Sequence, residues 1–225
     1  MASVEDDRRL LAGWSATLAG VGACPDDSLV DRIGSGLLER WHEPHRHYHG
    51  TSHLSAGLEA LHELGAGPLE AIAWWFHDAV HHNNPPWDEQ DSAQLARELL
   101  PALLAVEEVE EVARLVLLTI NHDAGADDAP GQRICDADLS PIGSAWPDYQ
   151  RSVGQLRRER ADLPDAVWES VRINFTGRML SRSSLFHTRT GRDRWQQQAL
   201  ANLTAERHAL LSADPHPPHR EETHR

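Results

Sequence analysis

Residues 70–82 read Glu70-Ala71-Ile72-Ala73-Trp74-Trp75-Phe76-His77-Asp78-Ala79-Val80-His81-His82, and this stretch decides the fold. The run from Ala71 to Phe76 is apolar without interruption, which is more than one face of a surface helix requires. A helix that is apolar on most sides is buried among other helices. We therefore expect residues 70–81 to form the central helix of a bundle, ended by Asn83-Asn84-Pro85-Pro86.

Helical periodicity continues on both sides of this stretch, and period-two alternation is absent. The sequence predicts an all-α bundle of roughly eight to ten helices. Apart from the central one, they are expected near 10–21, 30–41, 51–64, 88–104, 107–122, 134–142, 146–160, 164–182 and 192–211.

No internal repeat and no long linker divides the 225 residues. We expect a single domain over residues 1–211. The last stretch, residues 212–225, is rich in proline and polar residues and is predicted to be a disordered tail. Its histidines are therefore excluded from any site.

The net charge is −14 with histidine neutral. So acidic a chain is not expected to bind long nucleic acid, where contacts to phosphate dominate affinity. A small phosphorylated substrate is still compatible, because a bound cation reverses the local charge. No apolar run approaches the ~18 residues of a membrane helix. With two cysteines and no signal-peptide pattern, a cytoplasmic protein is expected.

Two metal-capable side chains, His77 and Asp78, directly follow the apolar run. An unpartnered aspartate anion at the wall of a core is very costly, and a divalent cation would offset that cost. His77 and His81 are four residues apart and would share one helix face. Taken alone, the His-Asp pair could equally be an exposed helix end.

Two further segments carry groups of the same kind. His49 and His53 are four residues apart at a predicted helix start, and Asp136 and Asp138 lie two apart. Positions two apart point in different directions on a helix, so one aspartate of this pair is expected to face the histidines. A mixed imidazole and carboxylate set suits a divalent ion such as Mn, Mg, Co, Ni, Zn or Fe, with one or two per chain.

Tyr48-His49-Gly50-Thr51-Ser52-His53 resembles a segment of the cyclic-nucleotide phosphodiesterases of the HD superfamily. In them the second histidine is a metal ligand and the first is the general acid, which implies these roles for His53 and His49. Ala137-Asp138-Leu139-Ser140 resembles their Ala-Asp-Leu-Ser and favours Asp138 as the ligand. Gly50 stands where they have asparagine, so the resemblance does not imply a cyclic nucleotide as substrate.

A closer resemblance, over most of residues 36–207, is to a bacterial family of predicted metal-dependent HD phosphohydrolases. It implies an HD-type helical domain with a metal held by His53, His77, Asp78 and Asp138. It also implies hydrolysis of a small phosphate ester or anhydride, nucleotides among them. The matching segments include Trp75-Phe76-His77-Asp78-Ala79-Val80, Glu89-x-x-Ser92-Ala93, Thr119-x-x-His122, Asp136-Ala137-Asp138-Leu139-Ser140, Phe186-His187-Thr188 and Asn202-Leu203.

The catalytic residues expected for such a reaction are His49, Asp78 and Glu89. His49 would protonate the leaving oxygen, since an imidazole titrates near neutrality. Asp78 could bridge to a second metal, and Glu89 could orient the attacking water or hold a histidine in place. His81 and His122 are candidates for a second metal or for orienting water.

Arginines are expected to bind the substrate phosphate, because a guanidinium makes paired hydrogen bonds to phosphate oxygens. Arg46 and Arg178 are the first candidates, and Arg182 and Arg189 are further ones. For each of them the alternative is an ordinary solvated helix face.

Two other functions remain open at this point. An HD-type di-iron oxygenase would need extra histidine ligands, which His81, His82 and His122 could supply. A non-catalytic nucleotide- or metal-binding module on the same scaffold is the other alternative, because fold does not determine function.

Overall fold

The computed structural model describes residues 4–22 and 27–212. Within these ranges the chain is all-helical, with no strand and with ten helices of nine residues or more, as the sequence predicted. The segment 23–26 and residues 213–225 of the expected tail lie outside the described residues. The longer helices are α1 Val4–Gly20, α2 Asp27–Trp41, α3 Thr51–Glu63, α4 Pro68–Phe76, α5 Trp87–Leu99, α6 Val106–Leu118, α7 Ala129–Leu139, α8 Trp146–Glu159, α9 Asp165–Leu180 and α11 Gln197–Ser212.

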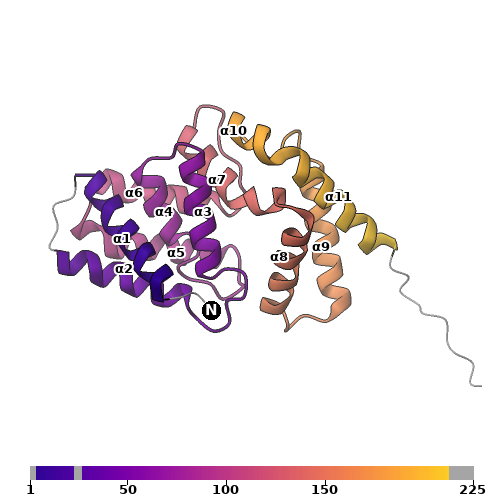
Figure 1. Cartoon of the computed structure of the whole chain (residues 1–225), viewed down its shortest axis with the longest axis horizontal. Helices are drawn as coiled ribbons and strands as arrows, with labels where there is room; N and C mark the ends of the chain where they lie inside the picture. The colour runs from indigo at the N-terminus through magenta and orange to yellow at the C-terminus, as the bar shows by residue number, and fades with distance from the viewer. Residues whose placement is uncertain (1–3, 23–26, 213–225) are drawn as a thin grey trace, which may run out of the picture.

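Short helical turns join several of these helices. They are η1 Leu100–Ala102, η2 Ser140–Gly143, α10 Arg189–Gly191 and the π-helical turn η3 Arg192–Gln196. In Figure 1, α1 to α6 gather at one end of the molecule and α8, α9 and α11 at the other, with α7 between them. No helix in the described segments is both long and apolar enough to cross a bilayer.

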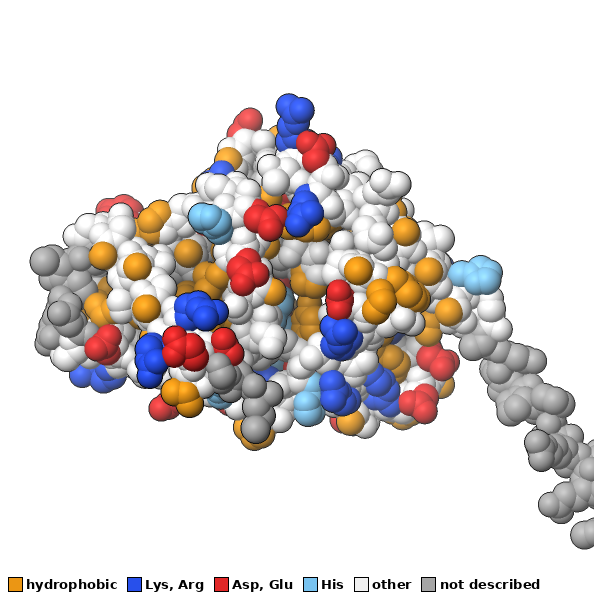
Figure 2. All heavy atoms as spheres, in the orientation of Figure 1, with side chains coloured by type: hydrophobic (Ala, Val, Ile, Leu, Met, Phe, Trp, Pro, Cys, Tyr) orange, Lys and Arg blue, Asp and Glu red, His pale blue; other side chains and the backbone are white. Residues whose placement is uncertain are grey.

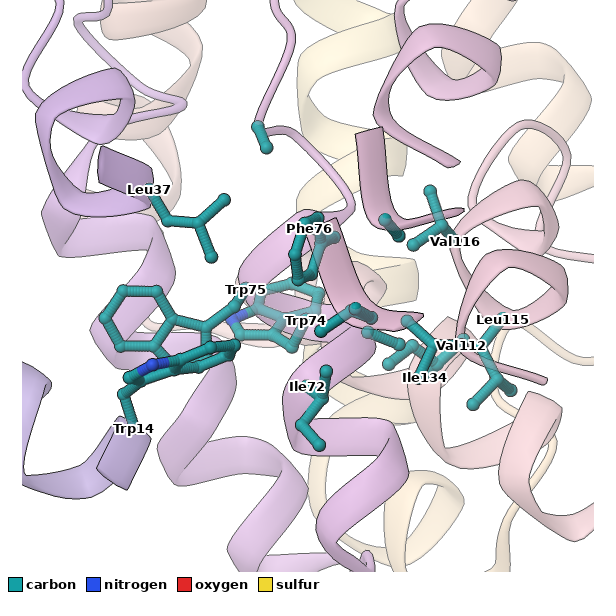
Figure 3. Close-up of a cluster of buried hydrophobic side chains, with 14 of the residues drawn as sticks. Trp14, Leu37, Ile72, Trp74, Trp75, Phe76, Val112, Leu115, Val116 and Ile134 are labelled. Carbon is teal, nitrogen blue, oxygen red and sulfur yellow. The ribbon is translucent and has the colours of Figure 1, made fainter. Parts of the chain in front are cut away.

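Helix α4 lies at the centre of the larger hydrophobic cluster, as its composition predicted. Figure 3 shows its side chains between Trp14 and Leu37 on one side and Val112, Leu115, Val116 and Ile134 on the other. Indole nitrogens in this core make hydrogen bonds to the backbone. Trp14 Nε1 donates to the carbonyl oxygen of Val30 at 3.0 Å, and Trp41 Nε1 donates to that of Trp75 at 3.1 Å. Burial of each large side chain contributes about 1.5–3 kcal/mol.

A second, smaller cluster joins α8, α9 and α11. Its apolar members include Met179, Phe186 and Leu203. Among them lies a buried polar group: Arg172 donates to Glu206 at 2.8 Å, and Tyr149 Oη donates to the same carboxylate at 2.5 Å. The half-buried Trp195 packs against both clusters.

The central helix is shorter than the sequence predicted, because α4 ends at Phe76 instead of reaching His81. The next residues form turns that α5 holds by hydrogen bonds. Ser92 Oγ accepts from the amide of Val80 at 3.0 Å, and Asp88 accepts from the amides of His82 and Asn84, each at 2.9 Å. The expectation that His77 and His81 share a helix face is therefore wrong.

Charged side chains of both signs are interspersed over the face shown in Figure 2, where neither sign gathers into one continuous patch. The negative net charge of the chain is therefore not concentrated on this face.

Candidate metal centre

The ends of α3 and α4 that carry His53 and His77 approach each other closely, because Gly57 of α3 faces Trp74 of α4. A Cβ added to Gly57 would lie 1.8 Å from Trp74 Cζ2, so only glycine fits there. Trp74 Nε1 donates to the carbonyl oxygen of Leu54 at 2.9 Å, which locks the two helices together. This contact places His53, on the first turn of α3, beside His77 at the end of α4.

Three ligand groups from three distant segments meet at one point. His53 Nε2 lies 3.2 Å from His77 Nε2, and Asp138 Oδ1 lies 3.4 Å from the first and 4.0 Å from the second. These atoms all fall within 4.8 Å of one another, so the group could hold a metal ion. Both imidazoles are buried, with side chains only 3% and 1% exposed.

Asp78 approaches the same two histidines. Its Oδ2 lies 2.9 Å from His77 Nε2 and 3.6 Å from His53 Nε2, although it is not one of the three mutually close groups above. Its side chain is 15% exposed, so one side of this carboxylate is open to the adjoining cavity. Asp78 is thus placed to be a fourth ligand.

The tautomer of His77 also suits a metal ligand. Its Nδ1 lies 2.8 Å from the carbonyl oxygen of Trp74, which can only accept, so Nδ1 carries the hydrogen and leaves Nε2 a lone pair in the neutral ring. Burial lowers the pKa of His77, but the carboxylates of Asp78 and Asp138 outweigh it and raise the pKa to about 9. His77 and His49 hold the pKa of Asp78 well below its usual range, and His122 and His53 do the same for Asp138, despite burial that acts to raise both. The donor set therefore fits a divalent cation, which would neutralise these anions and replace the proton.

His122 extends this cluster on the far side of Asp138. Its Nε2 lies 2.7 Å from Asp138 Oδ2, the oxygen that does not face His53. His122 follows α6 and has a φ of 54°, a conformation uncommon outside glycine. The structure thus brings His122 to Asp138, while His81 lies elsewhere.

His49 lies beside the cluster and is held by a glutamate that the sequence analysis did not single out. His49 Nδ1 lies 2.6 Å from Glu159 Oε2, and Glu159 Oε1 accepts from the amides of Tyr48 and His49 at 2.7 and 2.9 Å. Burial lowers the pKa of His49, but Asp78 and Glu159 outweigh it and raise the pKa above its ordinary value. Glu159 ends α8 in the run Arg157-Arg158-Glu159-Arg160, where no local motif marks it.

A cavity of about 240 Å³ opens onto these groups. Its lining includes His49, Asp78, Glu89, Arg160, Arg172 and Phe175. Glu89 Oε2 is buried without a hydrogen-bond partner in the described structure, and burial raises the pKa of this carboxyl. Arg172 is committed to Glu206, whereas Arg160 makes only a 3.4 Å contact with Asp162.

His81 lines the same cavity on the other side of His49. The rings of His49 and His81 lie 4.2 Å apart, and His81 Nε2 is 3.6 Å from Glu159 Oε2 with no hydrogen-bond partner. His49, His81 and Glu159 form a second group whose ligand atoms lie within 4.8 Å of one another, and which could also hold a metal ion.

The expectation that Arg46 binds a substrate phosphate is wrong. Its side chain is fully buried, and its guanidinium donates to the carbonyl oxygens of His49, Asp78 and Ala79 and to Glu43. Arg46 thereby ties the segment that carries His49 to the segment that carries Asp78, and it has no free edge for a ligand.

The other candidate arginines separate into two groups. Arg178 and Arg182 line a larger cavity next to His122, apart from the one at His49. Arg189 lines neither of them, has a side chain that is 91% exposed, and contacts Asp193 at 3.5 Å.

Asp136, two residues from Asp138, faces away from the histidines. It is fully buried and accepts from the amides of His187 and Thr188, at 2.7 and 2.8 Å, and from the Thr188 hydroxyl at 2.7 Å. These hydrogen bonds fix the loop before α10, so Asp136 has a structural role.

Comparisons with known proteins add no relatives. A scan against protein-family models, a search of curated proteins and a search of solved structures each returned no significant match for this chain. The resemblance to the HD superfamily stays a prediction from the motifs.

Proposed function

We propose that this chain is a metal-dependent phosphohydrolase with an HD-type site, acting on a small phosphate ester or anhydride. The observation that carries the proposal is the convergence of His53, His77 and Asp138 on one point, with Asp78 beside them. Nitrogen and carboxylate ligands, partly open to a cavity, are the set that catalytic divalent cations use.

His53, His77, Asp78 and Asp138 would hold the cation, and of these four Asp78 is the one that lines the cavity. A bound divalent cation supplies an acidified water molecule as nucleophile and polarises a phosphoryl oxygen. Glu89 lines the cavity with an unpartnered oxygen. It is placed to accept a hydrogen bond from a water molecule there and so to orient it.

His49 is the general acid in this proposal. Its Nδ1 is held by Glu159, which leaves Nε2 to carry the proton that the leaving oxygen takes up. The raised pKa favours the protonated form of His49, which this role requires. Glu159 acts through His49 and is a positioning residue.

The substrate head group is small. The cavity at His49 is about 240 Å³, below the ~300–1,000 Å³ typical of sites for larger ligands. Arg160 lines it and could donate paired hydrogen bonds to two phosphate oxygens. In this proposal Arg160 takes the role that the sequence analysis gave to Arg46.

A second candidate function has one observation in its favour. The group His49, His81 and Glu159 could hold a second cation, which a di-iron oxygenase of the HD type requires. Metal analysis after loading with iron, followed by an oxygen-uptake assay, separates the two functions. Two irons per chain and consumption of oxygen would favour the oxygenase.

The proposal is tested by a phosphatase screen of nucleotides and phosphate esters with Mn²⁺, Mg²⁺, Co²⁺ or Ni²⁺. Hydrolysis is expected with at least one metal, and Asp78→Asn should abolish it. The matched control is Asp91→Asn, an exposed carboxylate on α5 that should leave the rate unchanged. No hydrolysis with any of these metals, or equal rates in both variants, would contradict the proposal.

A further inference from the structure

An open cavity of about 760 Å³ next to His122 contains a group of positive charges. The C-terminal part of α9, the loop that contains His122 and the segment leading into η3 enclose it. Three arginines line it: Arg178, Arg182 and Arg192. Arg182 is half-buried, and Arg178 and Arg192 are exposed at its edge.

None of these three guanidiniums is paired with a carboxylate in the described part of the chain. Arg182 donates to the carbonyl oxygens of Asn121 and His122, and Arg192 to those of Phe186 and His187. The side chain of Arg178 makes no hydrogen bond or ion pair among the described residues, and its guanidinium lies 6.0 Å from the centre of the Phe175 ring. Asp123 is the one carboxylate among the residues that line the cavity.

Several other arginines of this chain are paired with carboxylates. Arg97 makes paired hydrogen bonds to Glu110, Arg114 binds Glu111 and Asp128, and Arg172 binds Glu206. In a chain of net charge −14, carboxylates are plentiful, so a group of three arginines without them is a local exception. Like charges held near one another repel, and a multiply charged anion between them removes that repulsion.

His122 connects this cavity to the metal centre. Its carbonyl oxygen accepts from Arg182 at 3.3 Å and from His187 Nε2 at 3.1 Å, while its own Nε2 contacts Asp138. Phe175 lines both this cavity and the smaller one at His49. A ligand in the arginine cavity would therefore touch residues that position a metal ligand.

We propose that the arginine cavity binds the phosphoryl group of a small phosphorylated molecule that carries at least two negative charges. The fork of a guanidinium matches two phosphate oxygens, and a cavity of this volume accommodates a molecule of nucleotide size. The molecule is either the substrate, bound through a phosphate remote from the one hydrolysed, or a separate effector. Its assignment to one of these roles depends on the proposed function, whereas the binding itself needs no metal.

The binding is tested with inorganic pyrophosphate, titrated calorimetrically into full-length protein stripped of metal, at constant ionic strength. The wild-type chain should bind it, and Arg178→Gln and Arg192→Gln should each weaken the affinity at least tenfold. The matched control is Arg189→Gln, which removes an exposed arginine that lines neither cavity and should leave the affinity unchanged. The side chain of Arg178 makes no hydrogen bond to another described residue, so its replacement should leave the fold intact. Circular dichroism checks this.

A second measurement assigns the role by adding pyrophosphate to the metal-loaded hydrolysis assay. Competitive inhibition that Arg178→Gln relieves places a substrate phosphate in the arginine cavity. A change in kcat without competition identifies an effector site. The proposal is overturned if metal-free protein does not bind pyrophosphate, or if both cavity variants bind it as tightly as wild type. Because that titration contains no metal, its result does not depend on whether the chain is a hydrolase.

Discussion

His49 Nδ1 lies 2.6 Å from Glu159 Oε2, although 110 residues separate the two in the chain. The same carboxylate accepts from the backbone amides of Tyr48 and His49, so it fixes the position of the segment as well as the ring. Glu159 is the last residue of α8, which belongs to the group of helices α8, α9 and α11. The metal-binding side chains come from α7 and from the group α1 to α6, so the first group completes a site that the other helices begin.

Replacing Glu159 should move the pH profile of hydrolysis. The Glu159 carboxylate is one of three carboxylates, with Asp78 and Asp138, that raise the pKa of His49 against the effect of burial. In Glu159→Gln that pKa falls, so the acid loses its proton at lower pH and the alkaline limb of kcat shifts to lower pH. We expect kcat at neutral pH to fall roughly 10- to 100-fold, as for other groups that orient a catalytic histidine. Steady-state kinetics from pH 5 to 9 measure both.

Glu169→Gln is the control for this variant, since Glu169 is exposed on α9. It should keep the wild-type pH profile. A lower kcat in Glu159→Gln with an unmoved alkaline limb would show that Glu159 has only a structural role.

The contribution of Glu159 to stability should depend on pH. Burial raises its pKa, but the hydrogen bond from His49 and the nearby ring of His81 outweigh this and hold the pKa below the ordinary value of 4.5. A depressed carboxyl pKa adds stability above 4.5 and loses it as the pH falls below that value. Glu159→Gln should therefore cost about 2 kcal/mol of unfolding free energy at pH 7, and the difference from wild type should shrink on acidification. Urea unfolding of metal-free protein at pH 7 and pH 4 measures it; a constant difference would contradict the assignment.

Substitutions of the two aspartates at the end of α7 should have different effects, one on stability and the other on metal binding. Asp136→Ala removes the acceptor of three hydrogen bonds at a fully buried position and should lower the unfolding free energy by about 3 kcal/mol. Asp138→Asn keeps the shape of the side chain and should weaken metal binding much more than it weakens the fold. Thermal unfolding and metal titration of both variants give the comparison. If the two variants lost metal affinity equally and were equally stable, the distinction between a structural Asp136 and a metal-binding Asp138 would be wrong.

Gly57 should tolerate no side chain. In Gly57→Ala the new Cβ would overlap the Trp74 ring, so α3 and α4 must separate at a cost of about 1–3 kcal/mol. Because His53 and His77 sit on these helices, metal affinity should fall as well. Gly154→Ala is the control: nothing lies within 4 Å of its added Cβ, and alanine in a helix should stabilise the chain by about 0.5–1 kcal/mol.

Much of the fold could be predicted from local patterns, because the helices carry clear apolar periodicity and α4 is apolar on nearly every side. The end of α4 could not, since Asp88 and Ser92 hold the turns that follow Phe76 through hydrogen bonds from another helix. Hydrogen bonds from another helix compete with the continuation of α4, and the local sequence after Phe76 does not show them.

The same distinction holds for the site. His53, His77, Asp78 and Asp138 stand in short recognisable segments, and the structure brings them together. Glu159 lies in an arginine-rich run without a motif, and only the approach of α8 to the Tyr48–His49 segment gives it a role. Arg46 stands beside that segment in sequence, yet its side chain turns inward to backbone carbonyls, which charge and position along the chain cannot show.

The central claim is that His53, His77, Asp78 and Asp138 bind one divalent cation. The most direct test is calorimetric titration of Mn²⁺ into metal-stripped wild type, His53→Ala and His62→Ala. His62 is exposed on the same helix as His53 and serves as the control. We predict that His62→Ala binds Mn²⁺ as wild type does and that His53→Ala binds it at least 100-fold more weakly. Equal affinity in His53→Ala and wild type would contradict the claim.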